Sequence, residues 1–139
     1  MFTVTEFLKR LGAPRKNTQW SWGSIRDDGA VFLPIYQDRI QKIDGSTYAR
    51  ITFHKVFENA QSNLGFRERL RQIEMIRQGA QCYVIAVVPQ DPYTRPRKIK
   101  SFNDEFVWAG GKIVEIDGES WIEMGEKIKA RDLFRVAVS

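Results

Sequence analysis

The sequence predicts one α+β domain over residues 1–139, with a curved or barrel-like, mostly antiparallel sheet of about six or seven strands. One main helix and a short N-terminal helix complete it. Three observations predict this class. The length suits a single domain, helical spacing occurs at two places, and short turn-bounded apolar runs fill the rest. Only one strand–helix–strand unit is present, which argues against a doubly wound parallel fold.

The short N-terminal helix is predicted over residues 4–11. Thr3 and Glu6 have the spacing of a capping box, in which each side chain satisfies a backbone N–H of the first turn. Gly12 followed by Pro14 ends the helix.

A β-hairpin follows. Residues 20–25 alternate large and small side chains, Asp27-Asp28-Gly29 is a turn signal, and residues 30–36 return as the second strand. Gly23 in the first strand indicates a close backbone approach or a bulge. A further strand is predicted over residues 47–53.

The main helix is predicted over residues 64–78, because Phe66, Leu70, Ile73 and Ile76 form one apolar stripe. The continuous apolar run of residues 83–88 predicts a central strand that is buried on both faces. Residues 90–100 hold Pro92 and Pro96 and are predicted to form a loop.

A second hairpin pairs residues 113–116 with residues 120–123 across Asp117-Gly118. Before it, residues 106–109 predict a short strand, and Gly110-Gly111 predicts a turn. Residues 134–138 are expected to form a last strand.

The composition limits the possible functions. Cys82 and His54 are the only cysteine and the only histidine, so the chain can form no internal disulfide and has too few ligands for a structural zinc site. A Cys82–His54 nucleophilic pair is conceivable, but no local pattern supports it. No apolar run spans a membrane and no signal peptide is evident, so we expect a cytoplasmic protein with no membrane partner, cofactor or metal.

Basic charge is concentrated in the first hundred residues, which hold 17 Lys+Arg against 9 Asp+Glu, whereas residues 101–139 hold 5 against 8. A polarised basic surface favours polyanions. The predicted phosphate contacts lie on the main helix and in the proline-containing loop, at Arg67, Arg71, Arg95, Arg97, Lys98 and Lys100. The alternative is an ordinary solvated surface.

Trp20 and Trp22 are two residues apart on the first predicted strand, so their side chains face the same side. With Tyr36 or Phe32 on the partner strand they can form an aromatic wall that stacks a flipped or single-stranded base. The alternative is that they belong to the core.

The order of Leu11-Gly12-Ala13, of Trp20-Ser21-Trp22-Gly23, of Val31-Phe32-Leu33 and of residues 97–102 resembles the N-terminal module of bacterial HNH-type, restriction-like endonucleases. The resemblance extends to PUA-like modified-base readers, the superfamily of the EVE, YTH and SRA domains. It implies an aromatic cage for a flipped base, with Trp20, Trp22 and Trp108 as candidates, and basic loops for the backbone. A single histidine departs from an HNH nuclease, so the resemblance implies a reader without the cutter.

The leading hypothesis is therefore a nucleic-acid-binding module, with DNA as its ligand, that senses a modified or flipped base in a restriction or mobile-element context. We expect no catalytic residues, and a separate nuclease or another protein as a partner. Two alternatives stay open. One is a protein-interaction or accessory subunit with an exposed apolar patch. The other is a small metal-dependent nuclease that uses Asp91, Asp104 or Glu105.

Overall fold

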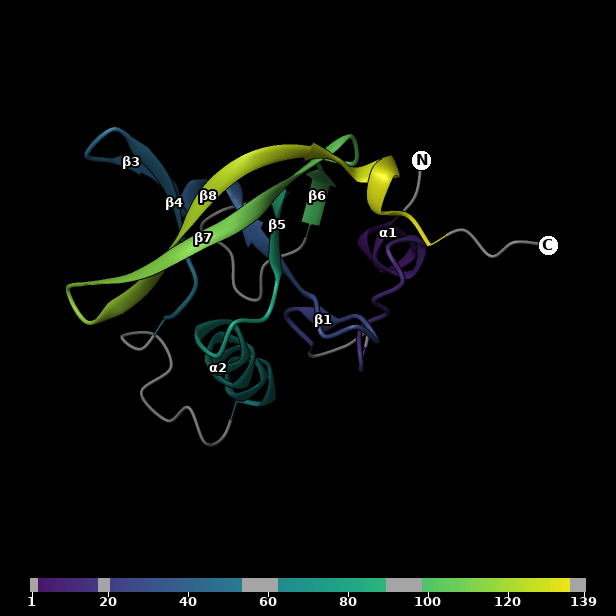
Figure 1. Cartoon of the computed structure of the whole chain (residues 1–139), viewed down its shortest axis with the longest axis horizontal. Helices are drawn as coiled ribbons and strands as arrows, with labels where there is room; N and C mark the ends of the chain where they lie inside the picture. Colours follow the sequence, from purple (N-terminus) through teal and green to yellow (C-terminus); the bar gives the residue numbers. More distant parts are fainter. Residues whose placement is uncertain (1–2, 18–20, 54–62, 90–98, 136–139) are drawn as a thin grey trace.

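The structure is a computed structural model that describes residues 3–17, 21–53, 63–89 and 99–135 (Figure 1). The α-helices are α1 (Val4–Arg10) and α2 (Leu64–Arg77), and the short 3-10 helices are η1 (Gln37–Arg39) and η3 (Ala130–Leu133). The strands are β1 (Ser24–Ile25), β2 (Val31–Tyr36), β3 (Ile40–Ile43), β4 (Ser46–Arg50), β5 (Cys82–Pro89), β6 (Ile99–Phe102), β7 (Phe106–Ile116) and β8 (Glu119–Lys129). Neither described α-helix has the length and apolar character needed to cross a membrane.

The described strands form one sheet in the order β1-β2-β5-β7-β8-β4-β3, and β6 pairs with β5 outside that path. Only β2 and β5 run parallel, and the other pairs are antiparallel. The predicted class is confirmed: an α+β fold with a mostly antiparallel sheet, a main helix and a short N-terminal helix. The sheet has eight strands and is open, so it is not a closed barrel.

The sheet is strongly curved. β2 and β3 are far apart in the strand order, yet only the three residues of η1 separate them in the chain. So short a connection reaches roughly 10–15 Å, so the sheet must curl to bring these two strands near each other. Ile35 of β2 and Ile40 of β3 accordingly pack into the same core cluster.

The two helices pack against opposite faces of the sheet. Along β5, Tyr83 and Ile85 belong to the core cluster that contains the apolar side chains of α1, whereas Cys82 and Val84 belong to the cluster that contains those of α2. Alternate residues of a strand point to opposite faces, so both faces of β5 are covered. This confirms the predicted central strand.

Two tight hairpin turns share one geometry, and the one at Asp117-Gly118 confirms the predicted second hairpin. Asp44 and Gly45 join β3 to β4 with φ of 51° and 84°, and Asp117 and Gly118 join β7 to β8 with φ of 51° and 81°. Positive φ at both central residues is the type I′ geometry, whose twist matches that of the paired strands. Asp and Gly tolerate this backbone better than other residues do.

The first predicted hairpin is present, but its first strand is short. β1 begins at Ser24 rather than at residue 20. The backbone N–H groups of Trp22 and Gly23 donate to the Glu68 carboxylate of α2 and not to a neighbouring strand. Hydrogen bonds to Glu68, which lies far away in the chain, therefore replace strand pairing before Ser24.

The predicted turn at Gly110-Gly111 is wrong, because β7 runs straight through both residues. Neither glycine has a positive φ; the register with β8 shifts on both sides of Gly110 instead. A Cβ on Gly110 would lie 2.8 Å from Ile122 Cδ1 and 3.0 Å from Cys82 Sγ. Glycine is thus needed here because β5 and β8 approach the backbone closely.

Two strands were not predicted. β3 and β6 are four residues each, and β6 begins inside the predicted loop. Their pairing with β4 and β5 stabilises them more than their own composition does. The predicted last strand is absent at Phe134 and Arg135, where η3 ends instead, and residues 136–138 lie outside the described residues.

Candidate nucleic-acid interface

A buried carboxylate of α2 holds the segment that carries Trp22. Glu68 is only 6% exposed. It accepts hydrogen bonds from Ser21 Oγ at 2.9 Å, from the backbone N–H of Trp22 at 3.0 Å and from that of Gly23 at 3.3 Å. Hydrogen bonds to an ionised acceptor are stronger than neutral ones, so three consecutive residues are anchored to one helix position.

Arg69, the next residue of α2, binds the same segment through a backbone carbonyl oxygen, whereas Glu68 binds its N–H groups. Its guanidinium donates to the carbonyl oxygens of Trp22 and Ile51, both at 3.3 Å, and lies 5.7 Å from the centre of the Trp22 ring. Complete burial lowers the pKa of Arg69 to about 10, and the nearby Cys82 and Glu68 oppose that shift. Arg69 therefore stays cationic at neutral pH. Its hydrogen bond to the Trp22 carbonyl oxygen and its position over the Trp22 ring fix both the backbone and the ring of that residue.

Two phenylalanines surround the Trp22 ring. Its centre lies 6.0 Å from that of Phe53, in an edge-to-face arrangement, and 5.7 Å from that of Phe66. Phe66 is fully buried, whereas Trp22 and Phe53 are partly exposed. Trp22 and Phe53 thus form a small aromatic surface above α2.

Two arginines lie over the Phe53 ring. The guanidinium carbons of Arg39 and Arg50 are 5.1 Å and 4.9 Å from its centre. Arg50 also forms an ion pair with the buried Glu119 at 2.7 Å, and Glu119 accepts from Thr52 Oγ1 at 3.0 Å. These contacts place two guanidinium groups at the edge of the aromatic surface, and one of them is paired with Glu119. We call Trp22, Phe53, Arg39 and Arg50, with the supporting Glu68 and Arg69, the Trp22 site.

Two of the predicted phosphate contacts lie on the same helix. Arg67 and Arg71 are both exposed, on the side of α2 that faces away from the sheet. The helix therefore supports the Trp22 site with its buried side and presents these two guanidinium groups on its outer side.

The structure does not bring the other predicted pocket residues to the Trp22 site. Tyr36 packs with the α1 cluster, on the opposite face of β2 from α2. Trp108 packs with the α2 cluster but on β7, opposite Lys127 of β8. Phe32, the alternative partner, stacks on Tyr83 in the α1 cluster.

The remaining predicted phosphate contacts lie on β6 or outside the described residues. Lys100 is exposed on β6, which pairs with the last residues of β5, far along that strand from Cys82. Trp20, Arg95, Arg97 and Lys98 lie outside the described residues.

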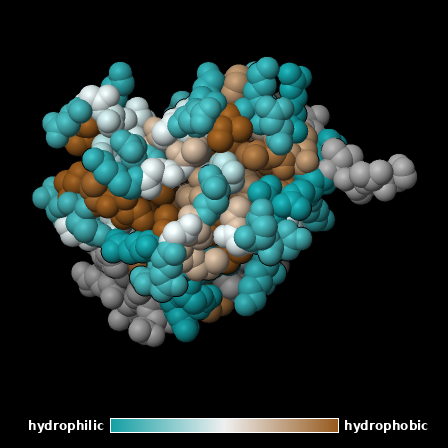
Figure 2. Space-filling model, in the orientation of Figure 1, coloured by the Kyte–Doolittle hydropathy of each residue, from teal (hydrophilic) through white to brown (hydrophobic). Residues whose placement is uncertain are grey.

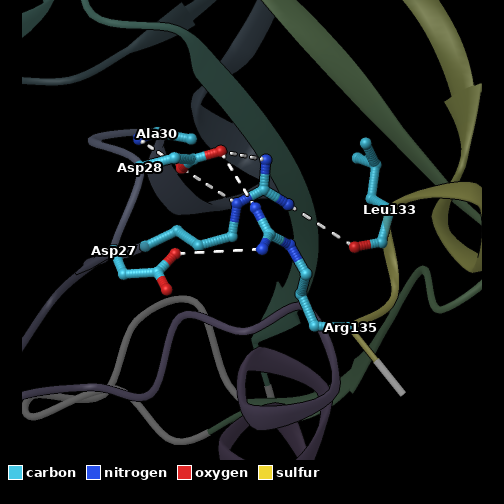
Figure 3. Close-up of polar contacts among 6 residues, drawn as sticks. Asp27, Asp28, Ala30, Leu133 and Arg135 are labelled. Atoms are coloured by element: carbon cyan, nitrogen blue, oxygen red, sulfur yellow. Dashed lines mark hydrogen bonds and ion pairs between the residues drawn. The ribbon is translucent and has the colours of Figure 1, made fainter. Parts of the chain in front are cut away.

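A second polar cluster ties the C-terminal part of the described chain to the first hairpin (Figure 3). Asp28 accepts from Arg26 at 3.0 and 2.9 Å and from Arg135 at 3.1 Å, and Asp27 lies 4.0 Å from Arg135. Arg26 also donates to the carbonyl oxygen of Leu133. Because these two arginines already face carboxylates, we assign the cluster a structural role.

This cluster makes stability depend on pH. The hydrogen bond from Arg26, and then that from the backbone N–H of Ala30, lowers the pKa of Asp28 from 3.8 to about 2. A carboxyl with a lowered folded pKa stabilises the fold above its unfolded pKa and loses that effect as the pH falls through the folded pKa. We expect Asp28→Asn to lower the urea midpoint at pH 7, with a gap to wild type that narrows between about pH 4 and pH 2.

Asp27→Asn is the matched control, because the Asp27 side chain is 84% exposed and only touches Arg135 at 4.0 Å. Its midpoint should stay near that of wild type at each pH. A gap for Asp28→Asn that is undiminished at pH 2 would argue against the pKa as its cause.

The residues considered for catalysis do not converge in the described structure. Burial raises the pKa of the Cys82 thiol to about 12, so it is a neutral core side chain, and His54 lies outside the described residues. Within residues 3–17, 21–53, 63–89 and 99–135, no three His, Cys, Asp or Glu side chains gather where they could hold a metal ion. Asp104 and Glu105 are exposed, and Asp91 is outside the described residues.

Sequence reasoning missed the supporting residues of the Trp22 site. Glu68 and Arg69 are charged, so the apolar stripe of the helix did not include them, yet both are buried, as is the polar Gln72 one turn further along. Gly65, Arg69 and Gln72 follow one another at helical spacing on the buried side of α2. The glycine at the start of this row is the feature of the sequence that indicates a buried side there.

Comparisons of the chain with known protein families, with curated proteins and with solved structures found no match.

Proposed function

We propose that this domain binds nucleic acid, with DNA as its ligand, at the Trp22 site. One observation carries the proposal: a partly exposed tryptophan is held by a buried Glu68–Arg69 pair through its backbone and its ring. Burying charged groups costs free energy, and these two groups fix Ser21, Gly23 and Ile51 as well as Trp22, so the position of the aromatic ring is set before any ligand binds. Aromatic rings stack on bases of any sequence, and guanidinium groups pair with phosphates.

The proposed path of the ligand crosses α2. A base stacks on Trp22 beside Phe53, and the strand continues along the exposed Arg67 and Arg71. The predicted contacts Arg95, Arg97, Lys98 and Lys100, and the predicted pocket residues Trp20, Tyr36 and Trp108, remain predictions outside this path. A flipped or modified base, a separate nuclease partner and a cytoplasmic location belong to the same proposal.

The test is fluorescence anisotropy with labelled single-stranded and duplex DNA over a salt series. We expect binding at low salt that weakens linearly in a plot of log K against log salt. Replacing both Arg67 and Arg71 by Ala should reduce the slope by roughly two, one for each lost phosphate contact.

The control replaces Lys9 and Arg10 by Ala, which removes the same charge from the exposed part of α1, on the other face of the sheet. This variant should keep the wild-type slope. No binding of the wild type at low salt, or binding that is insensitive to salt, would reject the proposal.

A second candidate function, protein interaction, is favoured by a different observation. Figure 2 shows hydrophobic side chains gathered over the β7–β8 hairpin. Ile113, Val114 and Ile116 of β7 are each only partly buried there. A partner that covers this hairpin would show as a larger mass in light scattering, with no dependence on DNA.

A further inference from the structure

Two guanidinium groups lie over the Phe53 ring, and they come from different parts of the fold. Arg50 donates from Nε to the carbonyl oxygen of Thr52 at 3.0 Å and from Nη2 to the buried Glu119 at 2.7 Å, so it belongs to the internal network of β4 and β8. Arg39 comes from η1, the surface turn between β2 and β3, and its side chain is partly exposed. Arg39 thus brings a cation to the ring from the surface of the fold.

Arg39 is held at both ends. The next residue anchors its backbone, because the N–H of Ile40 donates to the carbonyl oxygen of Gln37 and the Ile40 side chain packs in the α2 cluster. At the other end, the guanidinium carbon lies 5.1 Å from the centre of the Phe53 ring. A guanidinium that stacks by its face keeps its N–H groups in its own plane, and five donors allow an anion to bind beside any other partner. Arg39 is therefore positioned in advance for an anion next to Phe53.

Arg39 and α2 lie on different sides of the aromatic surface. The ring contacts run in the order Phe53, Trp22 and Phe66, with centres 6.0 Å and 5.7 Å apart, and Phe66 belongs to α2. Figure 1 shows α2 at the bottom of the view and β3, which begins directly after Arg39, at the top, with the chain that leaves β4 running between them. The Trp22 ring therefore lies between Arg39 and the helix that carries the exposed Arg67 and Arg71.

The spacing suits a nucleic-acid strand. The Arg39 guanidinium carbon is 5.1 Å from the Phe53 centre, which is 6.0 Å from the Trp22 centre. Arg39 is thus within about 11 Å of the Trp22 ring, or roughly three nucleotides at the 3.4 Å rise of one strand. A base that stacks on Trp22 has a guanidinium within reach of its backbone in each direction.

We propose that Arg39 binds a phosphate on the side of the stacked base opposite to α2, so that the Trp22 site takes an internal nucleotide of a continuous strand and not a strand end. This rests on the proposed function and adds which part of a strand the site holds. Phosphates can meet Arg39 on one side and Arg67 or Arg71 on the other only where the strand continues past the base in both directions. A terminal nucleotide loses one of these two contacts.

The first measurement compares three competitors on the wild-type full chain. Each is an unlabelled strand of about 12 abasic units in which one unit, at the centre, the 5′ end or the 3′ end, carries thymine. They displace a labelled single-stranded oligonucleotide, and they have the same charge, so only the position of the base differs. We expect the central thymine to bind roughly five- to tenfold more tightly than either terminal one at about 0.1 M salt, since each phosphate contact contributes about 0.7–0.9 to the slope of log K against log salt.

The second measurement tests the assignment to Arg39. Arg39→Gln should bind the central strand and one of the two terminal strands equally, because it loses the contact on one side of the base only. Its salt slope should fall by roughly one, and Arg39→Lys, which keeps the charge, should restore that slope. Lys42→Gln removes the same charge from an exposed position of β3 and should keep both the wild-type preference and the wild-type slope.

Equal wild-type affinity for the three strands, or a preference for the central thymine that Arg39→Gln retains, overturns the inference and leaves nucleic-acid binding at Trp22 in place. The same holds if Arg39→Lys has the low slope of Arg39→Gln, or if Lys42→Gln loses as much slope, because the effect would then not come from a cation at Arg39. No wild-type binding of any oligonucleotide rejects the proposed function together with the inference. Thermal unfolding shows whether each variant is folded, and the three-strand comparison on the wild type decides the matter if Arg39→Gln is not.

Discussion

Replacing Glu68 by alanine is expected to lower the free energy of unfolding by about 3–5 kcal/mol, because three donors lose their acceptor at a cost of about 1–3 kcal/mol each. The variant leaves Ser21 Oγ and the backbone N–H groups of Trp22 and Gly23 without the acceptor that they share. It also removes a negative charge that raises the pKa of the buried Arg69. Both effects act on the same few residues.

Urea denaturation followed by tryptophan fluorescence measures this loss. Glu74→Ala is the matched control, because Glu74 lies on the exposed side of the same helix and only accepts from Gln78. Its effect should stay within about 0.5 kcal/mol. A loss for Glu68→Ala that is no larger than that of the control would mean that the carboxylate does not anchor the Trp22 segment.

Replacing Trp22 by alanine is expected to weaken the binding of single-stranded DNA by roughly 5- to 150-fold, which is the range that one stacked base contributes. The loss should be similar for all sequences, because every base has a face to stack on a ring. It should also be largely independent of salt, since no phosphate contact is removed. Anisotropy measures the affinity, and thermal unfolding of the same sample shows whether the variant is folded.

Trp108→Ala separates the two aromatic positions that the sequence grouped together. Trp108 is also partly buried on the side of the sheet that faces α2, but it lies on β7 beside Lys127 rather than at the Trp22 site. We expect it to keep near wild-type affinity. If Trp108→Ala weakens binding and Trp22→Ala does not, the interface lies on the β7–β8 ribbon instead.

Much of the fold was predictable because its signals are local. Thr3 caps α1 by accepting from the N–H of Glu6, and Asp117-Gly118 turns the second hairpin, as the sequence indicates. Such features depend on a few neighbouring residues, whose conformational preferences are already present in the peptide. Gly110 shows the limit, because its role is to let Cys82 and Ile122 approach and not to turn the chain.

The candidate site was predictable only in part. Trp22, Arg67 and Arg71 were predicted from their spacing, and the structure finds Trp22 partly exposed and both arginines exposed. Phe53 was predicted as a strand residue without a role. It contacts Trp22, which lies far away in the chain, and no local sequence pattern relates the two residues. Tyr36 was grouped with Trp22, but the alternation of β2 directs it to the α1 side.

By itself, the sequence determined the α+β class, the two helices, the hairpin turns and the basic, aromatic character of the surface, because each depends on spacing or composition within a short stretch. Only the tertiary structure decided which polar residues of α2 are buried. Glu68 and Arg69 look like surface residues in the sequence, and their burial follows from hydrogen bonds to Trp22, up to 47 residues earlier in the chain. A helix buries a charge only where another segment supplies partners for it, and no local pattern contains that segment.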